Sequence, residues 1–246
     1  MQNGNGIALI VRDIGDPYFT QIAQGVTETA MNYDCLAMVF NSMQNTGFEK
    51  KYYQLIQQWQ FSGVLIGGGG YQTDEHNAIR SLIRSLQSIG IKTVALAPQG
   101  MEMPLVSIDN YMAGKDITNV LIRHGHRKIA FIGGYPNHIA DEERLAGYRA
   151  ALDQAGIGFD SGLVYHKEFS WQGGYESCSK LINSGKAFTA ICCSNDHIAA
   201  GTIQCLNDAG LRIPEDISVT GMGDLPHTSG NTAQLTTCLL YTSRCV

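Results

Sequence analysis

Short runs of apolar residues alternate along this chain with longer segments in which apolar residues recur at helical spacing. In the first part of the chain the runs are 7–11, 36–40, 63–66 and 93–97. They are continuous rather than alternating, which is typical of strands covered by helices on both faces. Helices are predicted between them, from Asp16-Pro17 onward, at 47–60 and at 74–89. This alternation predicts α/β structure with parallel sheets.

A second series of the same kind begins after Asp109. Its predicted strands are 129–132, 164–165, 190–193 and 217–221, with amphipathic helices between them. Two such series predict two doubly wound parallel-sheet lobes, an N-terminal lobe at 6–108 and a C-terminal lobe at 109–237. Because no Gly/Ser-rich linker lies at the boundary, we expect short crossings and a hinge between the lobes.

Composition excludes several classes of function. The 246 residues carry a net charge of −5 and only 16% charged residues, so the chain has no basic surface for nucleic acid. No apolar run is long enough to span a membrane, and residues 1–5 do not resemble a signal peptide. The seven cysteines include no Cys-x-x-Cys pair and fit reduced thiols in a cytoplasmic protein. His124 and His126 could form a metal pair, but no third ligand has suitable spacing.

Three ordered motifs carry a family resemblance. They are Val106-Ser107-Ile108-Asp109-Asn110, the segment from Gly125-His126-Arg127 to Gly133-Gly134, and Ser194-Asn195-Asp196. Together they resemble the effector-binding domain of the LacI/GalR family of bacterial transcription regulators, over roughly residues 6–237. The resemblance implies a type I periplasmic-binding-protein-like fold. It also implies a small-molecule effector, sugar or nucleoside-like, bound in a cleft between the lobes.

The same resemblance has implications for binding partners and for the two ends of the chain. Operator DNA would be contacted only through a helix-turn-helix that is missing from this chain, and the full-length protein would be a homodimer. Leu235-Thr236-Thr237 matches the family, whereas residues 238–246 resemble read-through of unrelated DNA. We therefore expect 238–246 to be a non-native tail that packs poorly, and the fragment to be less stable than the complete domain.

Candidate ligand-binding residues follow the predicted strands, because ligands of doubly wound folds bind at the carboxyl ends of the strands. Tyr18 and Phe19 lie where the family offers an aromatic wall. The helical spacing of Phe19 also fits a core residue. Arg144 matches an arginine that the family places in the cleft, and its guanidinium could grip two hydroxyls or a carboxylate. The alternative is a solvated arginine paired with Asp141 or Glu142.

Three further positions complete the predicted site. Phe169, or its neighbour Trp171, lies where the family has a stacking aromatic, although either could be a packing residue. Asn195 is expected to contact the ligand and Asp196 to serve structure, while either could cap a helix. Asp224 fills the second of two positions that the family usually makes acidic, and Gly223 fills the first. The pocket would then lack one carboxylate, which weakens the case for a plain hexose.

Other features of the sequence bear on alternative functions. Gly67–Gly70 lacks the Lys-Ser/Thr of a phosphate-binding loop and is expected to form a flexible cleft edge. No nucleophile–base set stands out, and no cofactor is expected. The first alternative is a periplasmic-type sugar-binding receptor of the same fold. The second is a nicotinamide-dependent oxidoreductase, which the absent dinucleotide-binding motif disfavours.

Overall fold

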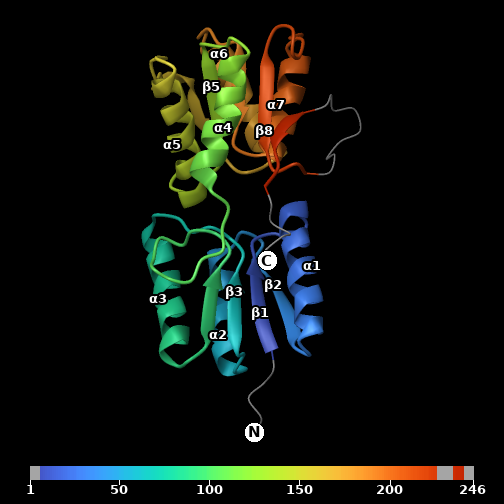
Figure 1. Cartoon of the computed structure of the whole chain (residues 1–246), viewed down its shortest axis with the longest axis vertical. Coiled ribbons are helices and arrows are strands. Elements are labelled where there is room, and N and C mark those ends of the chain that lie inside the picture. Colours follow the sequence, from blue (N-terminus) through green and yellow to red (C-terminus); the bar gives the residue numbers. More distant parts are fainter. Residues whose placement is uncertain (1–5, 226–234, 241–246) are drawn as a thin grey trace. The chain divides into compact units, whose positions relative to one another are not determined.

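A computed structural model describes residues 6–225 and 235–240 of the chain. These residues form two compact units, one of residues 6–108 and one of residues 109–240 (Figure 1). The change of unit falls between Ile108 and Asp109, where the sequence analysis placed its boundary. Each unit is an α/β structure around one parallel sheet, as predicted.

Unit 1 is built on a four-stranded sheet in the order β2-β1-β3-β4, with every neighbouring pair parallel. Its strands are β1 (Gly6–Val11), β2 (Leu36–Asn41), β3 (Gly63–Ile66) and β4 (Lys92–Ala95). Its helices are α1 (Pro17–Asn32), α2 (Thr46–Gln58) and α3 (Asp74–Ser88). Side chains of Asp16, Asn45 and Thr73 cap the three helices by accepting backbone N–H bonds. These caps satisfy donors that would otherwise lack partners.

The two faces of this sheet are covered unequally. Helices α2 and α3 pack on one face, where Tyr53, Ile56 and Ile83 are almost fully buried. Helix α1 packs on the other face against Leu9 and Val11. Strand residues therefore point alternately into two separate apolar clusters, as a doubly wound sheet requires.

Unit 2 is built on a five-stranded parallel sheet in the order β6-β5-β7-β8-β9. Its strands are β5 (Ile129–Gly133), β6 (Val164–His166), β7 (Ala190–Cys193), β8 (Ser218–Met222) and β9 (Thr236–Cys238). Its helices are α4 (Asn110–Arg123), α5 (Ile139–Gln154), α6 (Trp171–Asn183) and α7 (Asp196–Asp208). Helices α4 and α5 cover one face and α6 and α7 the other, around an apolar core of strands β5 and β7.

Glycines let the paired helices of unit 2 approach very closely. A Cβ atom at Gly147 of α5 would lie 2.0 Å from the carbonyl oxygen of Tyr111 in α4. A Cβ atom at Gly201 of α7 would lie 1.9 Å from the carbonyl oxygen of Trp171 in α6. Neither position leaves room for a side chain, so both glycines are required by packing.

The end of the second lobe differs from the predicted limit at residue 237. Cys238 pairs with Met222 in the β8–β9 ladder, and Leu240 packs against the cluster formed by α4 and α5. The first residues of the supposed tail therefore belong to unit 2, because they continue a strand and add apolar contacts. Residues 241–246 of the supposed tail lie outside the described residues.

None of the described helices is long and apolar enough to cross a membrane.

Candidate ligand-binding site

Arg144 lies at the carboxyl end of the unit 2 sheet, held in place by its neighbours. It sits in the second turn of α5, where Nε donates to Asn110 Oδ1 at 3.0 Å and Nη1 donates to the carbonyl oxygen of Ser194. Asn110 in turn donates to Glu143 Oε2 at 3.0 Å. The alternative pairing of Arg144 with Asp141 or Glu142 is not among its bonds. Among the described residues, Nη2 of Arg144 has no hydrogen-bond partner, so it can still bind another molecule.

Phe169 covers the exit of β5. A Cβ atom at Gly134 would lie 2.2 Å from the Phe169 ring, so only a glycine at this position leaves room for the ring. The ring meets His138 edge-to-face at 4.9 Å and Tyr135 at 6.2 Å between centroids. This places a half-buried aromatic group at the same edge of the sheet as Arg144. Trp171, the alternative, stacks on Tyr175 at 5.3 Å instead.

Asn195 and Asp196 are both engaged in structure. Asn195 caps α7, since its Oδ1 accepts from the backbone N–H of Ile198 at 2.9 Å. Asp196 is buried and accepts from the Thr237 hydroxyl at 2.7 Å and from the N–H of Leu225 at 2.9 Å. Burial raises the pKa of Asp196, and these two hydrogen bonds partly offset the effect. The structural role expected for Asp196 is present, and Asn195 keeps only its Nδ2 amide for a ligand.

Asp224 follows β8 at the same edge of the sheet. Its backbone has a positive φ of 52°, and its side chain is exposed to solvent. Its N–H donates to the Thr237 hydroxyl at 3.3 Å, which fixes the turn against β9. Gly223 before it also has a positive φ, of 139°. The carboxylate of Asp224 is therefore available to solvent and remains a candidate ligand contact.

Tyr18 and Phe19 belong to unit 1 and lie in the first turn of α1. Their rings meet edge-to-face at 5.1 Å, and both are half-buried. Both pack against the apolar cluster of Leu9, Val11 and Ile22. The core role weighed for Phe19 is thus partly present in both residues. Their exposed surfaces remain candidates for contact with a ligand.

Arg12 is a feature that the sequence analysis missed. It follows β1 directly, lies over the Tyr71 ring at 4.7 Å and donates through Nη2 to the carbonyl oxygen of Gly69. A Cβ atom at Gly68 would lie 2.5 Å from Arg12 Nε. The glycine run 67–70 is therefore closely packed around a guanidinium, and the expected flexible edge is not what the structure has. The sequence signal that could have identified Arg12 is its position as a charged residue directly after a buried strand.

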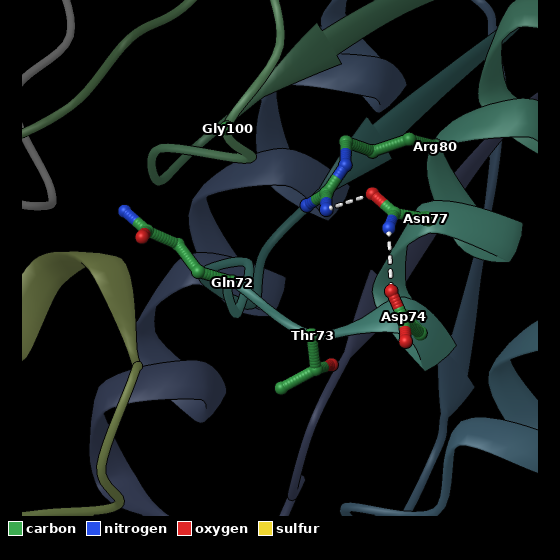
Figure 2. Close-up of a pocket in the computed structure, with 6 residues that line it drawn as sticks. All are labelled: Gln72, Thr73, Asp74, Asn77, Arg80 and Gly100. Atoms are coloured by element: carbon green, nitrogen blue, oxygen red, sulfur yellow. Dashed lines mark hydrogen bonds between the residues drawn. The ribbon is translucent and has the colours of Figure 1, made fainter.

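A pocket of about 480 Å³ opens in unit 1 near the exits of β3 and β4 (Figure 2). Its lining residues are Gln72, Thr73, Asp74, Asn77, Arg80 and Gly100. Figure 2 shows Arg80 bonded to Asn77 and Asn77 bonded to Asp74. Arg80 also donates to the carbonyl oxygens of Tyr71 and Gln99. These polar groups satisfy one another, and none of the predicted site residues lines the pocket.

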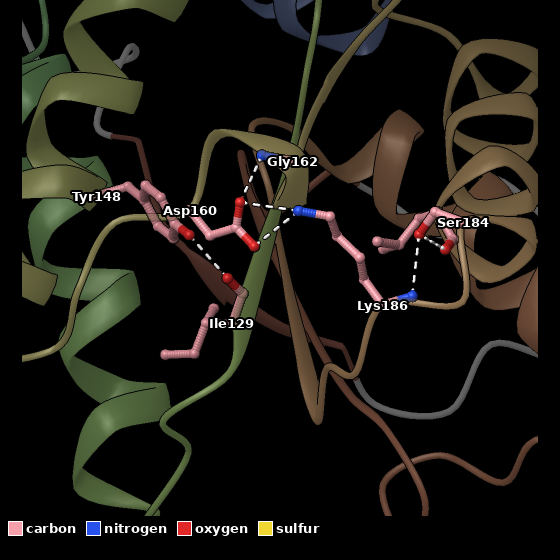
Figure 3. Close-up of polar contacts among 7 residues, drawn as sticks. Ile129, Tyr148, Asp160, Gly162, Ser184 and Lys186 are labelled. Atoms are coloured by element: carbon pink, nitrogen blue, oxygen red, sulfur yellow. Dashed lines mark hydrogen bonds and ion pairs between the residues drawn. The ribbon is translucent and has the colours of Figure 1, made fainter.

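Another set of polar contacts lies at the opposite end of the unit 2 sheet. Tyr148 donates to the carbonyl oxygen of Ile129, the first residue of β5, at 2.7 Å (Figure 3). Lys186 bonds both carboxylate oxygens of Asp160 at 2.8 and 2.9 Å, and this lowers the pKa of Asp160. Because ligands of this fold class bind where strands end, these contacts are structural.

The histidines and cysteines do not form a metal centre in the part of the chain that is described. His126, one of the pair considered above, bonds Thr189 through Nδ1 at 2.9 Å and Ser218 through Nε2 at 3.0 Å. Both of its ring nitrogens therefore tie β7 and β8 to the preceding loop. The six described cysteines are all free thiols.

The fold and these strand exits define a bilobal α/β binding protein, and comparison with known proteins gives its family. Residues 5–239 match the family of periplasmic binding proteins and sugar-binding domains of the LacI family. The chain belongs to this family. The transcriptional repressor CytR of Escherichia coli (strain K12) is 30% identical over 94% of this chain and 66% of its own length.

Solved structures agree with this assignment. The crystal structure of transcription regulator CcpA of Lactococcus lactis has a TM-score of 0.78 at 27% identity, covering 89% of this chain and 78% of that one. A complex of transcriptional regulator CelR with cellobiose has a TM-score of 0.80 at 26% identity, covering 90% and 68%. The chain spans about two thirds of the length of the curated relatives it matches.

Proposed function

We propose that this chain is the ligand-sensing part of a LacI-type bacterial transcription regulator. It binds a small metabolite, sugar or nucleoside-like, and thereby changes the affinity of the longer protein for operator DNA. DNA contact belongs to a helix-turn-helix segment outside the described residues, and the full-length protein acts as a cytoplasmic homodimer. The chain is a binding module and not an enzyme.

The observation that carries the proposal is the way Arg144 is held by hydrogen bonds while one guanidinium nitrogen remains without a partner among the described residues. Two of its three guanidinium nitrogens are fixed by Asn110 and Ser194 at the carboxyl end of the sheet. A guanidinium held in this way loses little rotamer entropy when it binds a ligand. Phe169 lies at the same edge and offers an aromatic face to the C–H groups of a sugar or to a base. Asn195, Asp224, Tyr18 and Phe19 are the further proposed contacts.

The experiment begins with a thermal-shift screen of sugars, nucleosides and their phosphates. The compound that stabilises the chain most is then measured by calorimetry on wild type and on Arg144→Ala. Loss of a charge-assisted hydrogen bond should cost about 1.5–3 kcal/mol, or roughly ten- to a hundred-fold in affinity. Arg149→Ala is the matched control, because Arg149 lies on the same helix but over the Phe159 ring. Equal affinity in wild type and folded Arg144→Ala would remove Arg144 from the site.

DNA binding gives a second test. The acidic chain has no basic recognition helix among its described elements, so the chain alone should not select an operator sequence. A gel shift with DNA from upstream of the gene checks this. Sequence-selective, salt-sensitive binding by the chain alone would contradict the assignment of DNA contact to another segment. A periplasmic-type sugar receptor is the alternative, and it predicts ligand binding without any operator response in the full-length protein.

A further inference from the structure

A histidine that the proposed function does not use lies at the end of β6. His166 is the register partner of Gly133, the last residue of β5. Its Nδ1 lies 3.3 Å from Oδ2 of Asp141, whose side chain is only 1% exposed in the first turn of α5. A Cβ atom at position 133 would lie 2.5 Å from that carboxylate oxygen and 2.6 Å from Nδ1. The missing side chain of Gly133 is therefore what allows the pair to meet.

The surroundings favour the charged form of both partners. Burial alone would lower the pKa of His166, but the Asp141 carboxylate, helped by Glu142, raises it overall. Burial alone would raise the pKa of Asp141, but the polar groups beside its carboxylate, His166 first and then Ser194 and the backbone of Gly134, lower it overall. The ion pair with the buried carboxylate therefore favours the protonated form of the His166 imidazole.

The other ring nitrogen of His166 has no such partner. Nε2 lies on the side of the ring away from Nδ1 and makes no hydrogen bond with any residue in the described ranges. The side chain keeps a fifth of its surface exposed, so Nε2 is not sealed in the core. An imidazolium whose Nδ1 is ion-paired with Asp141 therefore presents Nε2–H as a charged donor at the carboxyl edge of the sheet.

Arg144 belongs to the same polar network. It follows Asp141 by three residues on α5, so the two side chains share a face of the helix. Arg144 donates to the carbonyl oxygen of Ser194, which follows β7 at the same edge of the sheet. His166 Nε2 and Arg144 Nη2 are therefore the donors that remain for a ligand. The carboxylate of Asp141 is buried and already paired with His166.

We propose that His166 Nε2 and Arg144 Nη2 together bind an oxyanion of the effector, a carboxylate or a phosphate group. The inference rests on the proposed function and narrows the effector to an acidic small molecule. Both donors are cationic, and hydrogen bonds from cationic donors to an oxyanion are stronger than those to a neutral hydroxyl, so the pair favours an anionic group on the ligand.

The test follows the imidazole directly by NMR. The chain is labelled with ¹⁵N-histidine, and the His166 signals are assigned by their loss in His166→Gln. Glucose 6-phosphate, gluconate and glucose are then added at equal millimolar concentration and constant ionic strength. We expect both acids to shift His166 Nε2 and raise its pKa, and glucose to do neither. A stronger response to one acid tells phosphate from carboxylate.

Two controls make the result specific. His126 serves as the internal control, because both of its nitrogens are already bonded to Thr189 and Ser218. In Arg144→Gln the apparent affinity for the acids should fall at least ten-fold while the apo His166 signals stay in place.

The proposal is overturned if neither acid moves His166, if glucose moves it equally, or if His166 in the apo chain carries its proton on Nε2 alone. If a neutral ligand binds in calorimetry and its binding depends on Arg144, the proposed ligand-sensing function is supported and only the proposal of an oxyanion-binding site is wrong. Loss of the sensing function itself would appear as unchanged affinity in Arg144→Ala.

Discussion

Replacement of Gly147 by alanine should destabilise unit 2, although alanine is the better helix former. The new Cβ would lie 2.0 Å from the carbonyl oxygen of Tyr111 and 2.7 Å from the backbone nitrogen of Lys115. A carbon–oxygen contact needs about 3.3 Å, so α4 and α5 must separate by roughly 1.3 Å. Both obstructing atoms are backbone, so no side chain can turn aside.

The magnitude follows from two opposed effects. Overpacking of this kind costs about 1–3 kcal/mol, and a rigid obstruction belongs at the upper end of that range. The gain in helix propensity from glycine to alanine is about 1 kcal/mol. We therefore expect Gly147→Ala to lower the free energy of unfolding of unit 2 by about 1–2 kcal/mol.

Gly25 provides the matched control. It lies inside α1, and a Cβ atom there would meet nothing within 4 Å. Gly25→Ala should therefore stabilise unit 1 by about 0.5–1 kcal/mol. The chain has two tryptophans, Trp59 beside α2 and Trp171 in α6, so each unit carries its own fluorescence probe.

The assay is urea unfolding in two single-tryptophan backgrounds. Trp59→Phe leaves Trp171 to report unit 2, and Trp171→Phe leaves Trp59 to report unit 1. If Gly147→Ala shifts the Trp171 transition to higher urea, as Gly25→Ala should do for Trp59, the close approach of α4 and α5 is refuted.

Three other predictions concern unit 2. Tyr148→Phe should cost about 1 kcal/mol of stability in urea unfolding, because the buried hydrogen bond to Ile129 is lost. Asn195→Ala should cost about 1 kcal/mol by removing the cap, whereas Asn195→Asp should keep the cap and weaken ligand binding in calorimetry. The Asp141–His166 pair should stabilise the fold most between pH 3.8 and pH 6.5, the ordinary pKa values of the two groups. In Asp141→Asn the urea midpoint should therefore depend less on pH than in wild type.

The sign of the last prediction follows from the two shifts. The pKa of His166 is raised in the folded chain, so its stabilisation is complete below 6.5 and is lost as pH rises through the folded pKa. The pKa of Asp141 is lowered, so its stabilisation is present above 3.8 and is lost as pH falls through the folded pKa. Equal pH profiles in wild type and Asp141→Asn would contradict this account. Unaltered ligand affinity in Asn195→Asp would leave Asn195 as a cap alone.

Elements with a strong local pattern were predictable from sequence. The run Ala190–Cys193 is β7 residue for residue, and Pro17 begins α1 as its fixed φ favours. Asn195 was expected to contact the ligand, with a helix cap as the alternative; it caps α7 through Oδ1, and its contact with a ligand stays a prediction. Strand ends moved by one or two residues, since apolar runs do not mark where a ladder stops.

Features that depend on long-range register were not predictable. The Asp141–His166 pair requires Gly133 opposite His166, and nothing local in the sequence announces that pairing. Composition alone predicts a flexible glycine run after β3. Its actual packing depends on Arg12, more than fifty residues earlier in the chain.

The unequal covering of the two faces of the unit 1 sheet should affect how fast its backbone amides exchange hydrogen with solvent. One face is shielded by α2 and α3, whereas in the described ranges only α1 shields the other. In unit 2, by contrast, glycine-mediated helix pairs close both faces over β5 and β7. Backbone amides of β5 and β7 should therefore exchange with deuterium only when the whole unit opens. Amides of β2, an edge strand beside α1 with Leu36 63% exposed, should exchange through smaller and more frequent openings.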